Sequence, residues 1–184
     1  MSFAGGMFHV KHGRETARDG CASGSRIHHT EKTKENDMEL KVKIKLVREG
    51  GRVPSYQTEG AACCDLTAAV EEPLSIAPGE RALVPTGIAL DFGSPEWAAL
   101  IFARSGLASK RGLTLANAVG VIDSDYRGEI CVAMINLGSE TAVVSPGERI
   151  AQLGFFPVAR AVFALSEELA QTERGAGGFG HTGV

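Results

Sequence analysis

The sequence lacks the features that mark membrane-spanning, disulfide-stabilised and duplex-binding proteins. None of its apolar runs approaches the ~20 residues that a membrane-spanning helix needs. It contains no basic block, and 19 Lys and Arg against 22 Asp and Glu give a net charge of −3 over 184 residues. We therefore expect one soluble domain, with or without an appendage, that binds neither membranes nor nucleic acid.

Cysteine is also scarce, and its spacing predicts no disulfide framework. Cys63 and Cys64 are adjacent, Cys21 lies in a polar stretch, Cys131 lies in an apolar run, and no pair has the C-x-x-C spacing of a zinc site. This usage fits a reducing cytosol, so we expect a cytoplasmic protein with small, half-buried thiols.

The first 37 residues differ in composition from the rest. They hold four of the five His but no Pro, and their few apolar residues follow neither a period of 2 nor one of 3.6. Such a stretch buries too little surface to fold by itself. We expect residues 1–37 to be a disordered extension and Met38 to be the natural start.

Residues 38–172 have the pattern of an all-β domain. Leu40, Val42, Ile44 and Leu46 alternate with lysines, which is typical of a half-buried strand. Gly and Pro turn signals then recur every 8–15 residues between short apolar runs, which predicts a jelly-roll-like barrel or a sandwich. The expected strands include Arg81–Leu90, Trp97–Ala103, Glu129–Leu137, Thr141–Val144 and Ile150–Phe156. A short helix is expected at Ser105–Lys110, and a last turn at Ser166–Gln171.

Residues 173–184 form a Gly-rich tail with phosphate-binding chemistry. Glycine lets backbone N–H groups approach a phosphate, Arg174 is a bidentate donor, Phe179 can stack on a base, and Thr182 adds a hydroxyl. The Gly-Lys-Ser/Thr sequence of a P-loop is missing. The tail is therefore either a floppy end or a segment that closes over a ligand.

The cluster Arg104-Ser105-Gly106 stands where an apolar strand runs into the expected helix. Backbone N–H groups at a helix start, an arginine and a hydroxyl together can bind an anion. The alternative is a Ser that caps the helix beside an exposed Arg.

A third cluster runs from Asn117 through Asp123 to Tyr126. Gly120 indicates a hairpin or bulge, and Asp123 ends an apolar run, so its carboxylate could be partly buried and act as a base. A plain Asp-Ser-Asp turn is the alternative. Two further candidates are Asp65 at a strand start and polar Gln152 inside an apolar strand, although a turn acid and an outward-facing Gln would explain them equally.

In this order and spacing, the five clusters resemble the ordered motifs of the homotrimeric dUTPase family, over nearly all of residues 38–184. The resemblance implies a jelly-roll trimer whose three active sites each draw motifs from all three chains. It implies hydrolysis of dUTP to dUMP and pyrophosphate with Mg²⁺, which limits uracil incorporation into DNA and supplies dUMP for thymidylate synthesis.

The resemblance also implies a role for each motif. Asp65 would hold Mg²⁺ through its water shell, and Asp123 would orient and deprotonate the water that attacks the α-phosphorus. Tyr126 would pack under the deoxyribose and exclude a 2′-hydroxyl. The remaining substrate contacts would be Arg104, Ser105, Gly106 and Gln152 on the phosphates, Asn117, Val121 and Ile122 in a hairpin that reads uracil, and Arg174, Phe179, Gly180, His181 and Thr182 in the tail.

The sequence departs from the family pattern at two places. His181 stands where many members have Ser, and we hypothesise that it makes terminal-phosphate binding weakly pH-dependent. Cys63 and Cys64 replace a commoner Gly and aromatic residue before Asp65. The rival interpretations are a dCTP deaminase, which would need a Glu near the base, and a nucleotide-gated module that regulates a partner through the tail.

Overall fold

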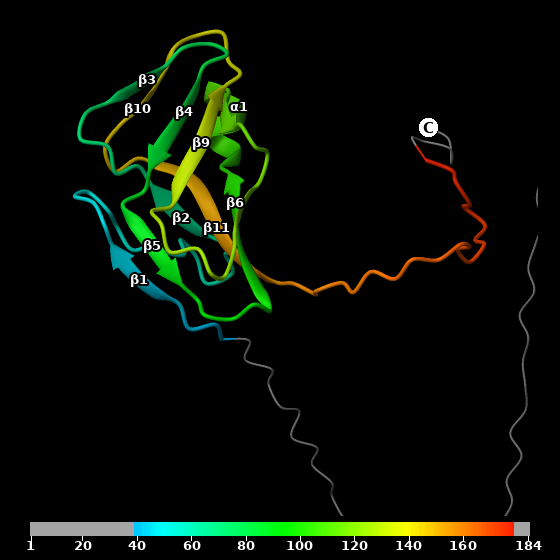
Figure 1. Ribbon diagram of the computed structural model, residues 1–184. Coiled ribbons are helices and arrows are strands. Elements are labelled where there is room, and N and C mark those ends of the chain that lie inside the picture. Colours follow the sequence, from blue (N-terminus) through cyan, green and yellow to red (C-terminus); the bar gives the residue numbers. More distant parts are fainter. Residues whose placement is uncertain (1–38, 179–184) are drawn as a thin grey trace, which may run out of the picture. The chain divides into compact units, whose positions relative to one another are not determined.

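The computed structural model describes residues 39–178, which lie in one compact unit of the chain. This part is built from short strands and one short helix, as Figure 1 shows, so the predicted all-β, jelly-roll-like fold class is confirmed. The predictions for residues 1–37, Met38, Phe179, Gly180, His181 and Thr182 lie outside the described residues. The elements are β1 Lys43–Leu46, β2 Cys64–Thr67, β3 Leu74–Ile76, β4 Arg81–Pro85, β5 Ile88–Asp91, β6 Trp97–Ala103, α1 Ser105–Arg111, β7 Leu113–Leu115, β8 Gly120–Ile122, β9 Cys131–Asn136, β10 Ala142–Val144 and β11 Arg149–Pro157.

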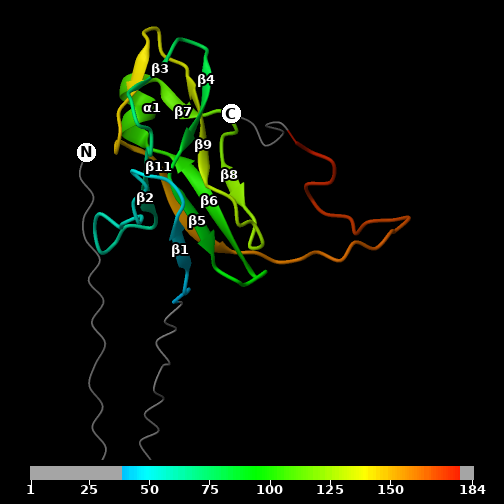
Figure 2. The ribbon, with the colours of Figure 1, turned by 60° about the vertical axis from the view of Figure 1, so that its left-hand side comes forward.

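The strands pair in four antiparallel sheets. The largest has the order β2-β11-β6-β8, a second has the order β4-β9-β7, and two further pairs are β1-β5 and β10-β3. Neighbours in each sheet are mostly distant in sequence, so the chain winds between sheets in the way that a jelly roll does. Figure 2 shows β6 and β11 crossing the middle of this body.

Alternating burial explains why these segments are strands. Along β9 the side chains are alternately half-buried and buried, and Val132, Met134 and Asn136 point inward. In the segment that leads into β1, Leu40, Val42 and Ile44 pack against the core while the lysines between them are exposed, as the alternation predicted. Leu46 breaks the pattern because it lies on the surface.

The helix α1 begins at the predicted residue and ends one residue later than predicted. Leu107 is its one buried residue, and Lys110 and Arg111 stand favourably in its last turn. Gly112 ends it in a left-handed conformation with φ 66°, where a Cβ would lie 2.2 Å from the backbone nitrogen of Gly138. Only glycine fits this close approach.

Two local predictions were wrong. The run 81–90 is not one strand, because Gly87 with φ 72° lies against the backbone of Gly51 and separates β4 from β5. Residues 166–171 form no helical turn.

The chain after β11, residues 158–178, contains no helix or strand, and we call it the C-terminal arm. Its first residue donates a backbone hydrogen bond to Glu96, and Figures 1 and 2 show the arm leaving the end of β11 as an extended chain. Four of its large apolar side chains are almost fully exposed: Val162 (96%), Phe163 (94%), Leu165 (108%) and Leu169 (87%).

Candidate active site

Three of the predicted site residues meet at one end of the central sheet. The antiparallel register places Gln152 of β11 between Asp65 of β2 and Phe102 of β6. Arg104 follows directly after β6, so it lies at the same end. Clusters far apart in the sequence are therefore joined by sheet pairing.

Asp65 is the centre of this group. Its side chain is only 4% exposed, its Oδ1 lies 3.2 Å from Nε of Arg104, and its Oδ2 lies 3.0 Å from Nη1 of Arg149. Arg104 also donates from Nη1 to the backbone oxygen of Arg149 at 2.9 Å. One buried carboxylate thus holds two guanidinium groups, and the remaining positive charge suits a polyanion.

Arg149 was not among the predicted site residues. Its side chain is 47% exposed, at the first position of β11, while its head group reaches the buried carboxylate. Only the pairing of β11 with β2 brings the two residues together. The available signal was a lone arginine beginning an otherwise apolar strand, which by itself is typical of a surface charge.

The simple helix-cap interpretation of the Arg104 cluster does not hold. Arg104 itself occupies the N-cap position with extended backbone, and no side-chain hydrogen bond caps the helix. Ser105 and Gly106 are exposed in the first turn. Their backbone N–H groups and the Ser105 hydroxyl follow Arg104 directly in the chain.

The residues present do not fit a directly coordinated metal ion. Residues 39–178 contain no group of three or more His, Cys, Asp or Glu side chains that could hold one. Both oxygens of Asp65 face guanidinium groups, although its buried Oδ1 makes no hydrogen bond and so keeps acceptor capacity. An ion could reach this end of the sheet only with most of its ligands supplied by a bound molecule or by water.

The predicted hairpin lies at the edge of the same sheet. β8 pairs with β6 alone, and Asn117, Ala118 and Val119 are exposed before it. Ala118 has φ 61°, a strained conformation for a residue with a side chain. Gly120 lets β8 approach Ile101, because a Cβ there would lie 3.1 Å from that side chain.

Asp123 follows β8 in a turn closed by a backbone bond of 3.1 Å from Tyr126 N to Asp123 O. The predicted partial burial of Asp123 is wrong for this chain alone, because the turn projects beyond the sheet edge and leaves the carboxylate exposed. Tyr126 is 45% exposed and donates its hydroxyl to the backbone oxygen of Glu129 at 3.0 Å. A Cβ on Gly128 would lie 2.3 Å from that hydroxyl, so only glycine allows this ring position.

Glu129 fixes the far end of this turn. Arg48 donates to both of its carboxylate oxygens at 2.9 and 3.0 Å, and Gly87 N donates to Oε1 at 3.0 Å. The hydrogen bond from Arg48 holds the pKa of the Glu129 carboxyl below its ordinary value, against a small opposing effect of burial.

Within one chain, the two halves of the predicted site lie apart. Ile122 pairs with Ala99 near the start of β6, whereas Arg104 follows its end. At about 3.3 Å per residue, the intervening strand separates Asp123 from Arg104 by roughly 20 Å. The single chain therefore joins Asp65, Arg104 and Gln152, but not Asp123 or Tyr126 with them.

In the tail, the structure describes Arg174 but not the residues from Phe179 onward. Arg174 is exposed and donates from Nε to the backbone oxygen of Gly177 at 2.9 Å, and its neighbours form a local turn with Thr172. These contacts of Arg174 and its neighbours all lie within residues 172–177.

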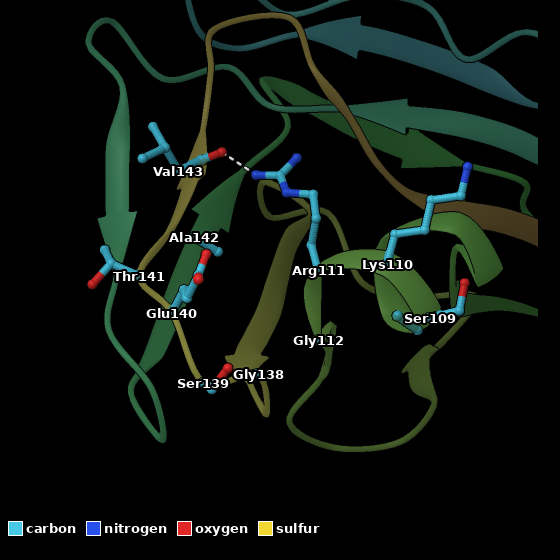
Figure 3. A pocket seen from close by; sticks show the side chains of 11 residues that line it. Ser109, Lys110, Arg111, Gly112, Gly138, Ser139, Glu140, Thr141, Ala142 and Val143 are labelled. Atoms are coloured by element: carbon cyan, nitrogen blue, oxygen red, sulfur yellow. Dashed lines mark hydrogen bonds between the residues drawn. The ribbon is translucent and has the colours of Figure 1, made fainter.

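A pocket of about 580 Å³ lies elsewhere, between the end of α1 and the residues around β10, and Figure 3 shows its lining. Arg111 reaches across it to the backbone oxygen of Val143 and also pairs with Glu148. No predicted site residue lines this pocket. Its arginine is already satisfied by these partners and so ties the helix to the end of the sheet.

The described cysteines behave as small packed side chains. Cys64 is buried, Cys63 and Cys131 are half-buried, and all three are free thiols. Burial raises the pKa of each of these thiols. They are thus protonated and weakly nucleophilic near neutral pH, in agreement with the sequence prediction.

Solved structures confirm the class of fold. A dUTPase variant from Staphylococcus bacteriophage 80alpha, solved with dUpNHpp, is 25% identical with a TM-score of 0.69, and the match covers 79% of this chain and 100% of that one. A variant of the dUTPase from phage phi11 of S. aureus, which coordinates a structural Mg(II) ion, is 22% identical with a TM-score of 0.65, and the match covers 71% and 99%. By fold, the protein is a member of this class of jelly-roll-like β-proteins.

Sequence comparison then gives the family. The family model for dUTPase matches residues 49–183. A deoxyuridine 5'-triphosphate nucleotidohydrolase from Desulfitobacterium hafniense is 54% identical over 147 residues, covering 79% of this chain and 97% of that protein. One from Paraburkholderia xenovorans is 49% identical over 146 residues, covering 79% and 99%. The chain belongs to the dUTPase family.

Proposed function

We propose that this protein hydrolyses dUTP to dUMP and pyrophosphate by attack of water on the α-phosphorus. The observation that carries the proposal is the cationic group at the end of β6, where Arg104 and Arg149 face one buried carboxylate beside Gln152. Phosphoryl chemistry needs chiefly positioned positive charge and an oriented nucleophile. This group supplies the first requirement, and the Asp123 turn supplies the second.

The phosphate half of the site consists of residues at this end of the sheet. Arg104, Ser105, Gly106 and Gln152 bind the phosphate oxygens. Asp65 holds the two guanidinium groups in place. Removing one of these partners would destabilise the fold, because the buried carboxylate would lose part of the positive charge that compensates it. Arg174 of the tail adds positive charge at the terminal phosphates when the tail closes.

The base half of the site consists of the hairpin and the turn that follows it. Asn117 and the backbone up to Val121 and Ile122 read the uracil edge, and the narrow hairpin excludes a thymine methyl group. Tyr126 packs under the deoxyribose. Asp123, exposed in the isolated chain, orients the attacking water and takes its proton.

A Mg²⁺ ion bound to the triphosphate would offset its negative charge. Asp65, at the same end of the sheet, would hold the ion through its water shell.

Complete sites require a homotrimer. The separation of roughly 20 Å along β6 prevents Asp123 from serving the phosphate group of its own chain. A neighbouring copy must supply it, and cyclic assembly provides three equal sites. The exposed apolar arm, with Val162, Phe163 and Leu165, has the composition of a segment that packs on another copy and delivers the tail there. The last residues, including Phe179, Gly180, His181 and Thr182, then close over the bound nucleotide.

The cellular role follows from the chemistry. Hydrolysis of dUTP would limit uracil incorporation into DNA and provide dUMP for thymidylate synthesis, and we propose a cytoplasmic location, as the cysteine usage predicts. In the described part of the chain, no helix has the length and apolar character to span a membrane.

The deciding experiment measures pyrophosphate release from dUTP, dTTP, dCTP and UTP in parallel, with Mg²⁺. We expect release from dUTP alone, because the hairpin rejects dTTP and dCTP and Tyr126 rejects UTP. Ammonia released from dCTP would instead identify a deaminase. Tight nucleotide binding with no turnover of any substrate would favour a regulatory module.

A further inference from the structure

We infer that Arg127 is a positioning residue that, through Asp91, fixes the turn carrying Asp123 and Tyr126. This inference rests on the proposed function, because it concerns how the attacking water is oriented. Arg127 touches no substrate in this scheme and acts only through the backbone of the turn.

The guanidinium group of Arg127 contacts two backbone carbonyls of its own turn. Nη1 donates to the oxygen of Ser124 at 2.7 Å and to the oxygen of Tyr126 at 2.9 Å. Ser124 directly follows Asp123 in the chain. Tyr126 is the residue that packs under the deoxyribose in the proposed site. The rigid fork of an arginine therefore sets the shape of the turn, which a lysine could not do in the same way.

The other arm of the fork ties this turn to a different sheet. Nη2 donates to Oδ1 of Asp91 at 2.8 Å, and Asp91 is the last residue of β5. The backbone of Asp91 is held in register opposite Lys43 of β1, whose Nζ lies 3.8 Å from Oδ2. We call Arg127 and Asp91 the turn clamp.

The turn has its other restraints mainly at the far end, at Tyr126 and Glu129. It follows β8, which is only three residues long and pairs with one neighbour, and Asp123 is exposed. A surface ion pair of this kind contributes little to stability, so the benefit of the turn clamp must lie in geometry. Catalysis demands placement of the base within about 0.5 Å, and a 1 Å error can cost about 100-fold in rate.

The test compares Arg127→Ala, Asp91→Ala and the double variant in the full-length protein. We expect each single variant to lower kcat for dUTP about 10- to 100-fold while the Kd of a non-hydrolysable dUTP analogue changes by less than about threefold. The double variant should be no slower than Arg127→Ala, because both changes break one clamp. Asp91→Asn keeps an acceptor for Nη2 and should retain more activity than Asp91→Ala.

Lys43→Ala is the matched control, because it removes the other partner of the same carboxylate without touching the turn, and we expect unchanged kcat. Wild-type kcat in Asp91→Ala, or additive losses in the double variant, would overturn the inference. If Arg127→Ala fails to assemble, the Asp91 variants decide. The Asp123→Asn variant separates failure of the proposed mechanism from failure of the turn clamp. A fully active Asp123→Asn variant would contradict the proposed mechanism and not the clamp.

Discussion

At the scale of single residues, the buried carboxylate of Asp65 shows what sequence patterns can and cannot reveal. The motif order identified Asp65, Arg104 and Gln152, and the sheet register brings them together. Arg149 was missed because its partner is 84 residues away, so no local spacing signals the ion pair. The exposure of Asp123 was also missed, because an apolar run before it does not say whether the next residue passes beyond the sheet edge.

Asp123→Asn tests the assignment of the general base. The amide keeps the size and can still contact a water, but it cannot accept the proton. We expect nucleotide affinity to stay near that of the parent and kcat to fall by about 10²- to 10⁴-fold. Single-turnover kinetics with dUTP gives the measurement, and a kcat near that of the parent would refute the role.

Glu129 leads to a prediction about pH and stability. Because Arg48 lowers the folded-state pKa of Glu129, the ionised pair stabilises the fold above the unfolded-state pKa, and this contribution is lost as pH falls toward the folded-state value. Arg48→Gln should therefore be less stable than the parent at neutral pH, and the difference should shrink between about pH 5 and pH 3. Urea denaturation across this range measures it, and a difference independent of pH would contradict the pairing.

At the scale of elements, some apolar segments were predictable from the sequence and others were not. Trp97–Ala103 is the predicted strand without change, and α1 differs from its prediction by one residue. β3, β7 and β8 have three residues each, too few to reveal a period, whereas the equally short β10 lies within the predicted segment Thr141–Val144. β2 is buried on both faces, so it shows no alternation.

The tail is an element whose removal should separate catalysis from assembly. Truncation after Thr172 deletes Arg174 and the residues that follow but leaves the apolar part of the arm intact. We expect dUTP hydrolysis to be lost, because water and the terminal phosphates are no longer enclosed, while the trimer persists. Native mass spectrometry together with a pyrophosphate assay checks both, and dissociation into monomers would make the tail structural instead.

At the scale of the whole molecule, the C-terminal arm is the feature that favours the proposed trimer. Four large apolar side chains between residues 162 and 169 are exposed by 87% or more. Such exposure of apolar surface to water is unfavourable in a monomer and is typical of a protein–protein contact. Composition could predict the β-body but not this feature, because an apolar residue in sequence looks the same whether its own core or another copy covers it.

Phe163→Glu, combined with Leu165→Glu, should weaken the trimer. Each of these apolar side chains contributes about 1.5–3 kcal/mol when buried, and a buried carboxylate adds a further penalty. Analytical ultracentrifugation should show dissociation at micromolar concentration and a loss of activity that tracks it. Val53→Glu, at an exposed apolar position of the β-body, is the control and should leave the trimer intact. A stable trimer in the double variant would exclude the arm as its main contact.

The geometry of β6 has a consequence for mixtures of defective proteins. If Arg104 of one copy always forms a site with Asp123 of another copy, Arg104→Gln and Asp123→Asn damage different faces of the subunit. A mixed trimer of the two inactive proteins can then contain intact sites. Unfolding and refolding an equal mixture should restore about one site in four, since a site is intact when an undamaged phosphate face meets an undamaged base face. Activity would therefore arise from two samples that have almost none, and a regained fraction near one quarter would show that Arg104 and Asp123 of one site come from different chains.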